Sequence, residues 1–105
     1  MSVLEYRISK DDTLPKLRHV LKLNGAVIDI TSATVTLERV RRIDGLAVPV
    51  VGTIAKIDAV GGIAEFSPDP LDTADRDVYD LHWVLTWVDG RLTLPTDCPV
   101  RMIVL

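Results

Sequence analysis

The chain has 105 residues and a formal net charge of −3, with 48% hydrophobic and 26% charged residues. This length fits one domain with one modest core, and the hydrophobic share excludes a disordered chain. Proteins that neutralise phosphates usually carry a basic excess, which this chain lacks, so we expect no nucleic-acid partner.

Three further sequence features bear on where the protein acts. The single cysteine, Cys98, can neither form an internal disulfide nor supply a paired-cysteine metal site. No apolar run approaches the roughly 18 residues that a membrane span needs, so we expect no membrane partner. The N-terminal residues lack the basic start and apolar centre of a signal peptide. We therefore expect the protein to be made and folded in a cytoplasm.

Glycine and proline recur along the chain and separate segments rich in valine, isoleucine, leucine, threonine and aromatic residues. This pattern is typical of a β-sandwich or a barrel and unlike that of a helical bundle. The expected strands cover residues 3–9, 16–23, 26–30, 34–43, 46–57, 62–67, 78–88, 91–95 and 99–104. The segment 70–75 has no alternation, and we expect it to form a short helical turn that crosses from one sheet to the other. The sequence thus predicts a single all-β domain over residues 1–105.

Two predicted hairpins define an antiparallel sheet. The first turns at Asn24-Gly25, a pair that favours the positive φ angles of a type I′ turn. Its expected register pairs Leu23 with Ala26, Leu21 with Ile28, and His19 with Ile30. The second turns at Asp89-Gly90, and its expected register pairs Val88 with Arg91, Trp87 with Leu92, Thr86 with Thr93, and Leu85 with Leu94.

The strand that leads into the second hairpin carries the predicted core. Strict alternation places one set of large apolar side chains on a single face of this strand. These residues are Tyr79, Leu81, Trp83, Leu85 and Trp87. We expect this face to be buried and the opposite face to meet water.

The acidic stretch 69–80 is the best candidate for a metal site, because calcium takes six to eight oxygen ligands. Its aspartates are Asp69, Asp72, Asp75, Asp77 and Asp80. Their spacing does not match an EF-hand, and aspartate and proline are also common in turns. We expect a soluble crossover here, with a calcium site as the alternative.

The two histidines have no nucleophile motif beside them. His19 lies on an inward-leaning position of the first hairpin, and His82 lies on the face opposite Trp83. We therefore predict no enzyme activity, no catalytic residue, no cofactor and no metal ligand.

Arginines gather on the strand expected at 34–43. Arg39 and Arg41 share one face of this strand, and Arg42 lies on the other. Charged side chains commonly protect an exposed sheet edge, which is the simpler interpretation. The alternative is that Arg39 and Arg41 meet acidic groups on a neighbouring subunit. The apolar C-terminal residues, including Ile103 and Leu105, are expected either to close a sheet or to pack on a partner.

The order of motifs along the chain resembles that of a phage structural family. The motifs are "DTLPKLRHVL", "NGAVIDITSATVTL" and "DTADRDVYDLHWVLTWVDGRLTLPTD". Immunoglobulin-like domains similar to the N-terminal domain of siphophage baseplate upper proteins share this order. The matching residues are Asp12, Thr13, Leu14, Pro15, Leu17, Leu21, Gly25, Val27, Ile28, Asp29, Ile30, Thr31, Ala33, Thr34, Val35, Asp72, Thr73, Tyr79, Trp83, Leu85, Asp89, Gly90, Arg91, Pro95 and Asp97. Ser32, Asp77 and Cys98-Pro99 depart from the family pattern.

The resemblance implies an immunoglobulin-like antiparallel β-sandwich that serves as a virion component of the tail, baseplate, neck or capsid surface. It implies no catalysis; its partners would be other virion proteins and copies of itself in a symmetric assembly. The contact residues we expect are Val3, Tyr6, Arg39, Arg41, Ile103 and Leu105, together with an N-terminal strand or arm at 1–10. The alternative is a carbohydrate- or peptide-binding β-sandwich of the receptor-binding type, which requires Trp83 or Trp87 to be exposed.

Overall fold

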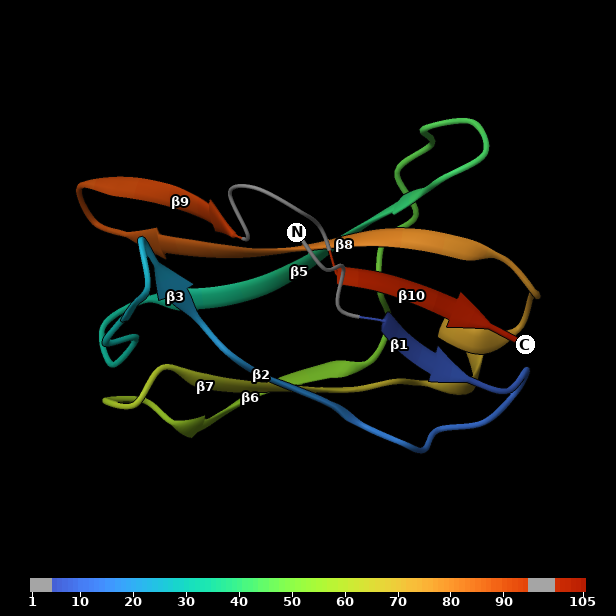
Figure 1. The fold of residues 1–105 in the computed structure, drawn as a ribbon, viewed down its shortest axis with the longest axis horizontal. Coiled ribbons are helices and arrows are strands. Elements are labelled where there is room, and N and C mark those ends of the chain that lie inside the picture. The colour runs from blue at the N-terminus through green and yellow to red at the C-terminus, as the bar shows by residue number, and fades with distance from the viewer. Residues whose placement is uncertain (1–4, 95–99) are drawn as a thin grey trace.

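The computed structural model describes residues 5–94 and 100–105, which form two facing layers of strands (Figure 1). The first layer has the order β1-β10-β8-β5, and β9 pairs with the remaining part of β8. Its strands are β1 (Glu5–Ile8), β5 (Thr34–Arg41), β8 (Val78–Trp87), β9 (Gly90–Leu94) and β10 (Val100–Val104). The second layer has the order β2-β7-β6, with β2 (Leu17–Val20), β6 (Thr53–Asp58) and β7 (Ile63–Ser67). The all-β, sandwich-like character predicted from the sequence is thus confirmed.

One strand organises the first layer. The first half of β8 pairs with β10 and its second half pairs with β9, while β5 pairs with β8 along its length. All three pairings are antiparallel, but β1 joins β10 in parallel, which the sequence interpretation did not anticipate.

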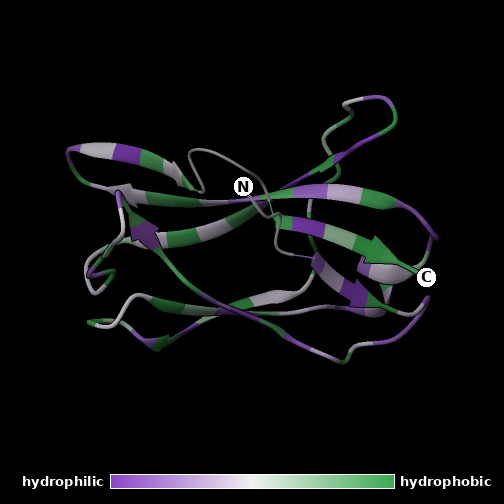
Figure 2. Ribbon diagram, in the orientation of Figure 1, coloured by the Kyte–Doolittle hydropathy of each residue, from purple (hydrophilic) through white to green (hydrophobic). Residues whose placement is uncertain are grey.

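The core lies between the layers and follows the alternation of β8. Tyr79, Leu81, Trp83 and Leu85 are at most 3% exposed, as predicted, and Trp87 is half-buried. Hydrophobic and hydrophilic residues alternate along the strands (Figure 2). Because alternate side chains point to opposite faces, this pattern directs one apolar set of each strand inward. Val84 is the exception, since it is buried on the face that was expected to meet water.

The predicted helical turn is present over a shorter span. Residues Pro70–Thr73 form a 3-10 helix, η1, which carries the chain from β7 in the second layer to β8 in the first. Asp69 caps it, with its side chain accepting a hydrogen bond from the Leu71 amide. Proline at the first helical position needs no hydrogen bond to its nitrogen, which explains why the turn begins at Pro70.

The segment predicted as one strand at 16–23 divides at Leu21. Residues before it form β2, which pairs with β7, and residues after it form the short hairpin of β3 (Lys22–Leu23) and β4 (Ala26–Val27). His19 therefore lies opposite Ala64, and its predicted pairing with Ile30 is wrong. Leu21 lies at the point of division: its amide donates to the Gly62 carbonyl in the register of β2 with β7, and its carbonyl accepts from the Ile28 amide in the register of the hairpin.

The strand predicted at 46–57 is also shorter than expected. Residues before Thr53 lie outside a named strand, apart from an isolated bridge between Ala47 and Val40. The amides of Val51 and Gly52 bond to the side chain of Asp72 and so are not used in a sheet.

The two predicted turns have different outcomes. Asn24 and Gly25 have φ angles of 53° and 81°, and Leu23 pairs with Ala26, so the first turn is confirmed. In the second hairpin Trp87 pairs with Gly90 and Leu85 with Leu92, so the loop is Val88-Asp89 and the predicted register is wrong by two residues. Neither Asp89 nor Gly90 has a positive φ. A shift of two residues leaves every side chain on its original face, and alternation therefore cannot detect it.

Replacing each turn glycine by alanine should separate these two geometries. Neither Gly25 nor Gly90 has a neighbouring heavy atom within 4 Å of an added Cβ, so the substitutions differ only in φ. We expect Gly25→Ala to lower the free energy of unfolding by about 1–2 kcal/mol, because a Cβ is strained at positive φ. Gly90→Ala should be neutral or stabilise by up to about 1 kcal/mol. Urea unfolding of both variants checks this, and equal losses would contradict it.

Candidate functional site

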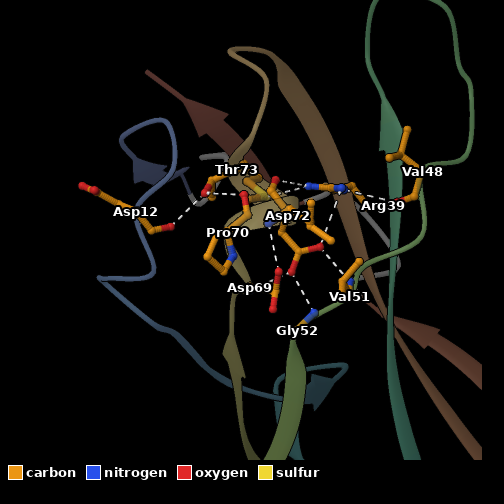
Figure 3. A network of polar contacts seen from close by, with 11 residues as sticks. Asp12, Arg39, Val48, Val51, Gly52, Asp69, Pro70, Asp72 and Thr73 are labelled. Atoms are coloured by element: carbon orange, nitrogen blue, oxygen red, sulfur yellow. Dashed lines mark hydrogen bonds and ion pairs between the residues drawn. The ribbon is translucent and has the colours of Figure 1, made fainter.

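A heavily bonded buried polar pair, an arginine of the first layer and an aspartate of the crossing between the layers, lies at this crossing (Figure 3). Arg39 of β5 is 4% exposed and Asp72 of η1 is 1% exposed. Arg39 Nη1 donates to the Asp72 carbonyl, and its Nε donates to the Val48 carbonyl at 3.2 Å. The guanidinium carbon also lies 4.3 Å from the centre of the Tyr79 ring, a cation–π contact.

The carboxylate of Asp72 is satisfied mainly by backbone amides. Its oxygens accept hydrogen bonds from Val51 at 2.7 Å, Gly52 at 2.8 Å and Asp69 at 2.9 Å. Arg39 Nη2 adds an ion pair at 3.9 Å from Oδ1. Gly52 is needed here because an added Cβ would lie 2.2 Å from the Ser67 carbonyl oxygen. The carboxylate therefore fastens the segment before β6 to η1 and to β5.

The next residue, Thr73, ties the N-terminal part of the chain to the same point. Its hydroxyl donates to the Asp12 carbonyl at 2.8 Å, and its carbonyl accepts from the Asp11 amide at 2.8 Å. Tyr6 of β1 donates its hydroxyl to the Pro15 carbonyl nearby. Burial and the negative charge of Asp72 raise the pKa of Tyr6 to about 12, so the phenol stays neutral. We call this group of Tyr6, Arg39, Asp72 and Thr73 the buried polar junction.

The junction changes the interpretation of the predicted contact residues. Arg39 and Tyr6 are 4% and 5% exposed, so their side chains offer little surface to a partner, and their contact with a neighbouring subunit stays a prediction. Within its own chain Arg39 already has an acidic neighbour, Asp72, at 3.9 Å. The sequence contained a signal for the burial of Arg39, because alternation places it on the same strand face as the apolar residue Leu37. Leu37 is buried in the structure.

The other predicted contact residues differ in exposure. Arg41 pairs with Asp77 at 3.3 Å and with Asp44 at 3.4 Å, both in its own chain. Ile103 is half-buried and Leu105 is 51% exposed. Val3 lies outside the described residues. Whether Arg41, Ile103 and Leu105 contact a partner stays a prediction.

The two histidines occupy different environments. His19 accepts a hydrogen bond on Nδ1 from the Nε1 of Trp83 at 3.0 Å, which links β2 of the second layer to β8 of the first. Burial lowers the pKa of His19, because the charged imidazolium loses hydration there. His82 is half-buried on the outer face of β8, opposite Glu38 of β5.

The acidic stretch uses its side chains within the protein. Asp72 binds amides, Asp77 accepts from the Val78 amide at 2.8 Å, and Asp80 lies 3.6 Å from Arg42. Among residues 5–94 and 100–105, no group of three or more histidine, cysteine or acidic side chains is placed to hold a metal ion.

A groove runs beside β5 on the side away from β8. Its volume is about 550 Å³. Residues of β5 form one wall and residues 47–54 form the other; the lining residues are Thr36, Leu37, Glu38, Arg39, Val40, Ala47, Pro49, Val50, Gly52 and Ile54. Most of these are apolar, and the guanidinium of Arg39 is already bonded to the buried polar junction.

Comparison with known proteins gives no family. No protein-family model matches the chain, and no curated protein matches its sequence. Within the part of the chain that the structure describes, no helix is long and apolar enough to cross a membrane.

Breaking the buried polar junction should strongly destabilise the fold. Asp72→Ala removes the carboxylate that balances the charge of the buried Arg39 and leaves the amides of Val51, Gly52 and Asp69 without their acceptor. We expect a loss of about 3–5 kcal/mol in the free energy of unfolding. Asp75→Ala, a matched change at an exposed aspartate, should stay within about 0.5 kcal/mol of the wild type. Denaturant unfolding measures both.

A double variant tests whether the charges are coupled. Arg39→Met with Asp72→Ala should cost less than the sum of the two single changes, because neither charge is then left alone. Additive losses in the same unfolding measurement would show that the two residues act independently.

The His19–Trp83 link should make stability depend on pH. Since the folded-state pKa of His19 lies below the ordinary value of 6.5, the unfolded chain takes up the proton first as pH falls. Stability is then fully present above the ordinary pKa and falls below it, by at most about 1.4 kcal/mol per pH unit for this group. Urea unfolding between pH 8 and about 5 should show this loss. His19→Asn should reduce the slope, and an unchanged slope would assign it to other groups.

Proposed function

We propose that this protein is an immunoglobulin-like structural domain of a phage or prophage virion, where it acts through protein–protein contacts in a symmetric assembly. The observation that carries the proposal is where the motif residues lie. Asp12, Pro15, Asp72 and Thr73, from motifs far apart in the sequence, meet at or beside the buried polar junction. The motif order therefore corresponds to a set of architectural positions.

The strand order supports the immunoglobulin-like part of the proposal. Immunoglobulin-type sandwiches place strands A, B, E and D in one sheet and C, F and G in the other. Here β2-β7-β6 corresponds to B-E-D, and β5-β8 followed by β9 and β10 corresponds to C-F-G. In this assignment strand G is divided into β9 and β10, and β1 pairs in parallel with β10 at the end of the sheet.

The bonding of the polar groups supports a non-catalytic role. Asp72, Arg39, Thr73 and His19 all bond to groups of their own chain, so they serve as links between strands and layers. A protein built in this way acts through its outer surface. Symmetric assemblies repeat one contact many times, so a modest contact per copy is enough.

The receptor-binding alternative is weaker than the sequence indicated. Trp83 is 0% exposed, and its indole N–H is bonded to His19, so it cannot stack on a sugar or a peptide. Trp87 is half-buried. The alternative therefore depends on Trp87 alone.

Immunogold electron microscopy of purified phage particles tests the virion assignment. Antibodies against this protein should place gold at a fixed position on the particles, on the tail, baseplate, neck or capsid. The same antibodies absorbed with the purified protein should leave the particles unlabelled. Gold that is confined to host material would contradict the proposal.

A further inference from the structure

Part of the β5 edge has backbone groups that the described residues leave unpaired. On the side away from β8, the Arg39 carbonyl accepts from the Val48 amide at 2.7 Å, and the Arg41 amide donates to the Leu46 carbonyl at 2.8 Å. Backbone groups of a strand alternate in direction, so those of Val35 and Leu37 point to the same side. In residues 5–94 and 100–105, no backbone hydrogen bond is made there.

This free stretch has definite ends. Val48 occupies the edge at Arg39, and the chain bends away before Thr34, where the Ala33 amide donates to the Ile30 carbonyl at 3.1 Å. Residues 34–38 therefore form an edge with room for about five residues of another strand. Residues 46–48 already pair with its continuation, through the antiparallel bridge between Val40 and Ala47, so this edge accepts antiparallel pairing.

The free edge carries a charge only at its end, at Glu38, whereas the other sheet edges carry charges along their length. β1 carries Glu5 and Arg7, and β6 carries Lys56 and a register shift between Lys56 and Asp58. Thr34, Val35, Thr36 and Leu37 are uncharged, and most of them are β-branched. Charges and bulges normally prevent edge-to-edge pairing, and residues 34–37, which have neither, are a template for another strand.

We propose that the occupant of this edge is the same strand of a second copy, paired antiparallel about a twofold axis at Thr36. This register pairs Val35 of each copy with Leu37 of the other, so all four free backbone groups of each copy find partners. It also places Thr34 opposite Glu38 and Thr36 opposite itself. No like charges face each other, whereas a register centred on Glu38 would oppose two carboxylates.

The contact joins the first layers of two copies into one continuous sheet. The contact between the two copies ends at Arg39, because the Arg39 carbonyl already accepts the Val48 amide of its own chain. Its length therefore equals that of the free stretch in each chain. Leu37 lines the groove beside β5, and Val35 of the second copy would lie opposite it. The inference deepens the proposed function by naming one contact of the assembly. It can fail while the virion assignment stands, because gold labelling does not depend on this edge.

Self-association in solution tests the contact. The purified full chain should form a dimer of twice 11.6 kDa as its concentration rises, in sedimentation equilibrium or light scattering. Thr36→Lys puts two positive charges opposite each other and should leave a monomer. The matched control is Thr93→Lys, since Thr93 is exposed on β9 in the same row, opposite Val84, which in turn lies opposite Thr36.

The oligomeric states of the wild type and of the two variants decide whether the contact exists. A dimer for the wild type and for Thr93→Lys, with a monomer for a folded Thr36→Lys, supports the proposal. A wild-type monomer at every soluble concentration overturns it. So does a Thr36→Lys variant that dimerises as strongly as the wild type, because the contact would then lie elsewhere.

Disulfide trapping tests the register. Directly opposed residues of a non-hydrogen-bonded pair have Cα atoms about 4.5 Å apart, within the range of a disulfide. In a Cys98→Ser background, which removes the single native thiol, Thr36→Cys should form a covalent dimer on mild oxidation. Thr34→Cys should not, since its thiol would face Glu38. Cross-linking of Thr34→Cys without Thr36→Cys would overturn the proposed pairing.

Discussion

The ion pair between Arg39 and Asp72 is the constraint on which the other features of this fold depend. It joins a strand of the first layer to the crossing between the layers, at a point with almost no exposure to water. Such a pair contributes little net stability compared with apolar residues of the same size, because both charges lose hydration. The ion pair instead restricts the arrangement of the chain. A buried charge without a partner would be destabilising, and few other arrangements pair both Arg39 and Asp72. The pair thereby fixes how the crossing lies on β5.

The same carboxylate determines where the open surface lies. By binding the amides of Val51 and Gly52, Asp72 holds this segment at η1, and the segment then continues as β6 of the second layer. The segment therefore follows the β5 edge only as far as Val48. The groove and the free edge begin at that point of departure. The interaction that holds the interior together thus also sets the length of the exposed edge.

The sequence was informative wherever alternation or turn chemistry decides the structure. The buried face of β8 and the Asn24-Gly25 turn both follow from local rules. The Asp89-Gly90 register did not, because two registers that differ by two residues bury the same faces. The segment 46–52 has the composition of a strand, but the amides of Val51 and Gly52 bond to Asp72, about 20 residues later in the chain. Contacts between distant residues of this kind leave no periodic signal.

The interpretation of Arg39 from the sequence followed its charge and not its place in the alternation of the strand. Its alternation places it inward with Leu37, yet its charge favoured an interpretation as a surface or interface residue. Because Arg39 is buried, the residues of β5 at 34–37 present threonine and valine at the surface, with Glu38 at the end of this stretch. Association through such an edge would rest on backbone hydrogen bonds and on the shape of the strand. A charge on Thr36 would then matter more than one on Arg41, whose guanidinium is already paired with Asp77 and Asp44.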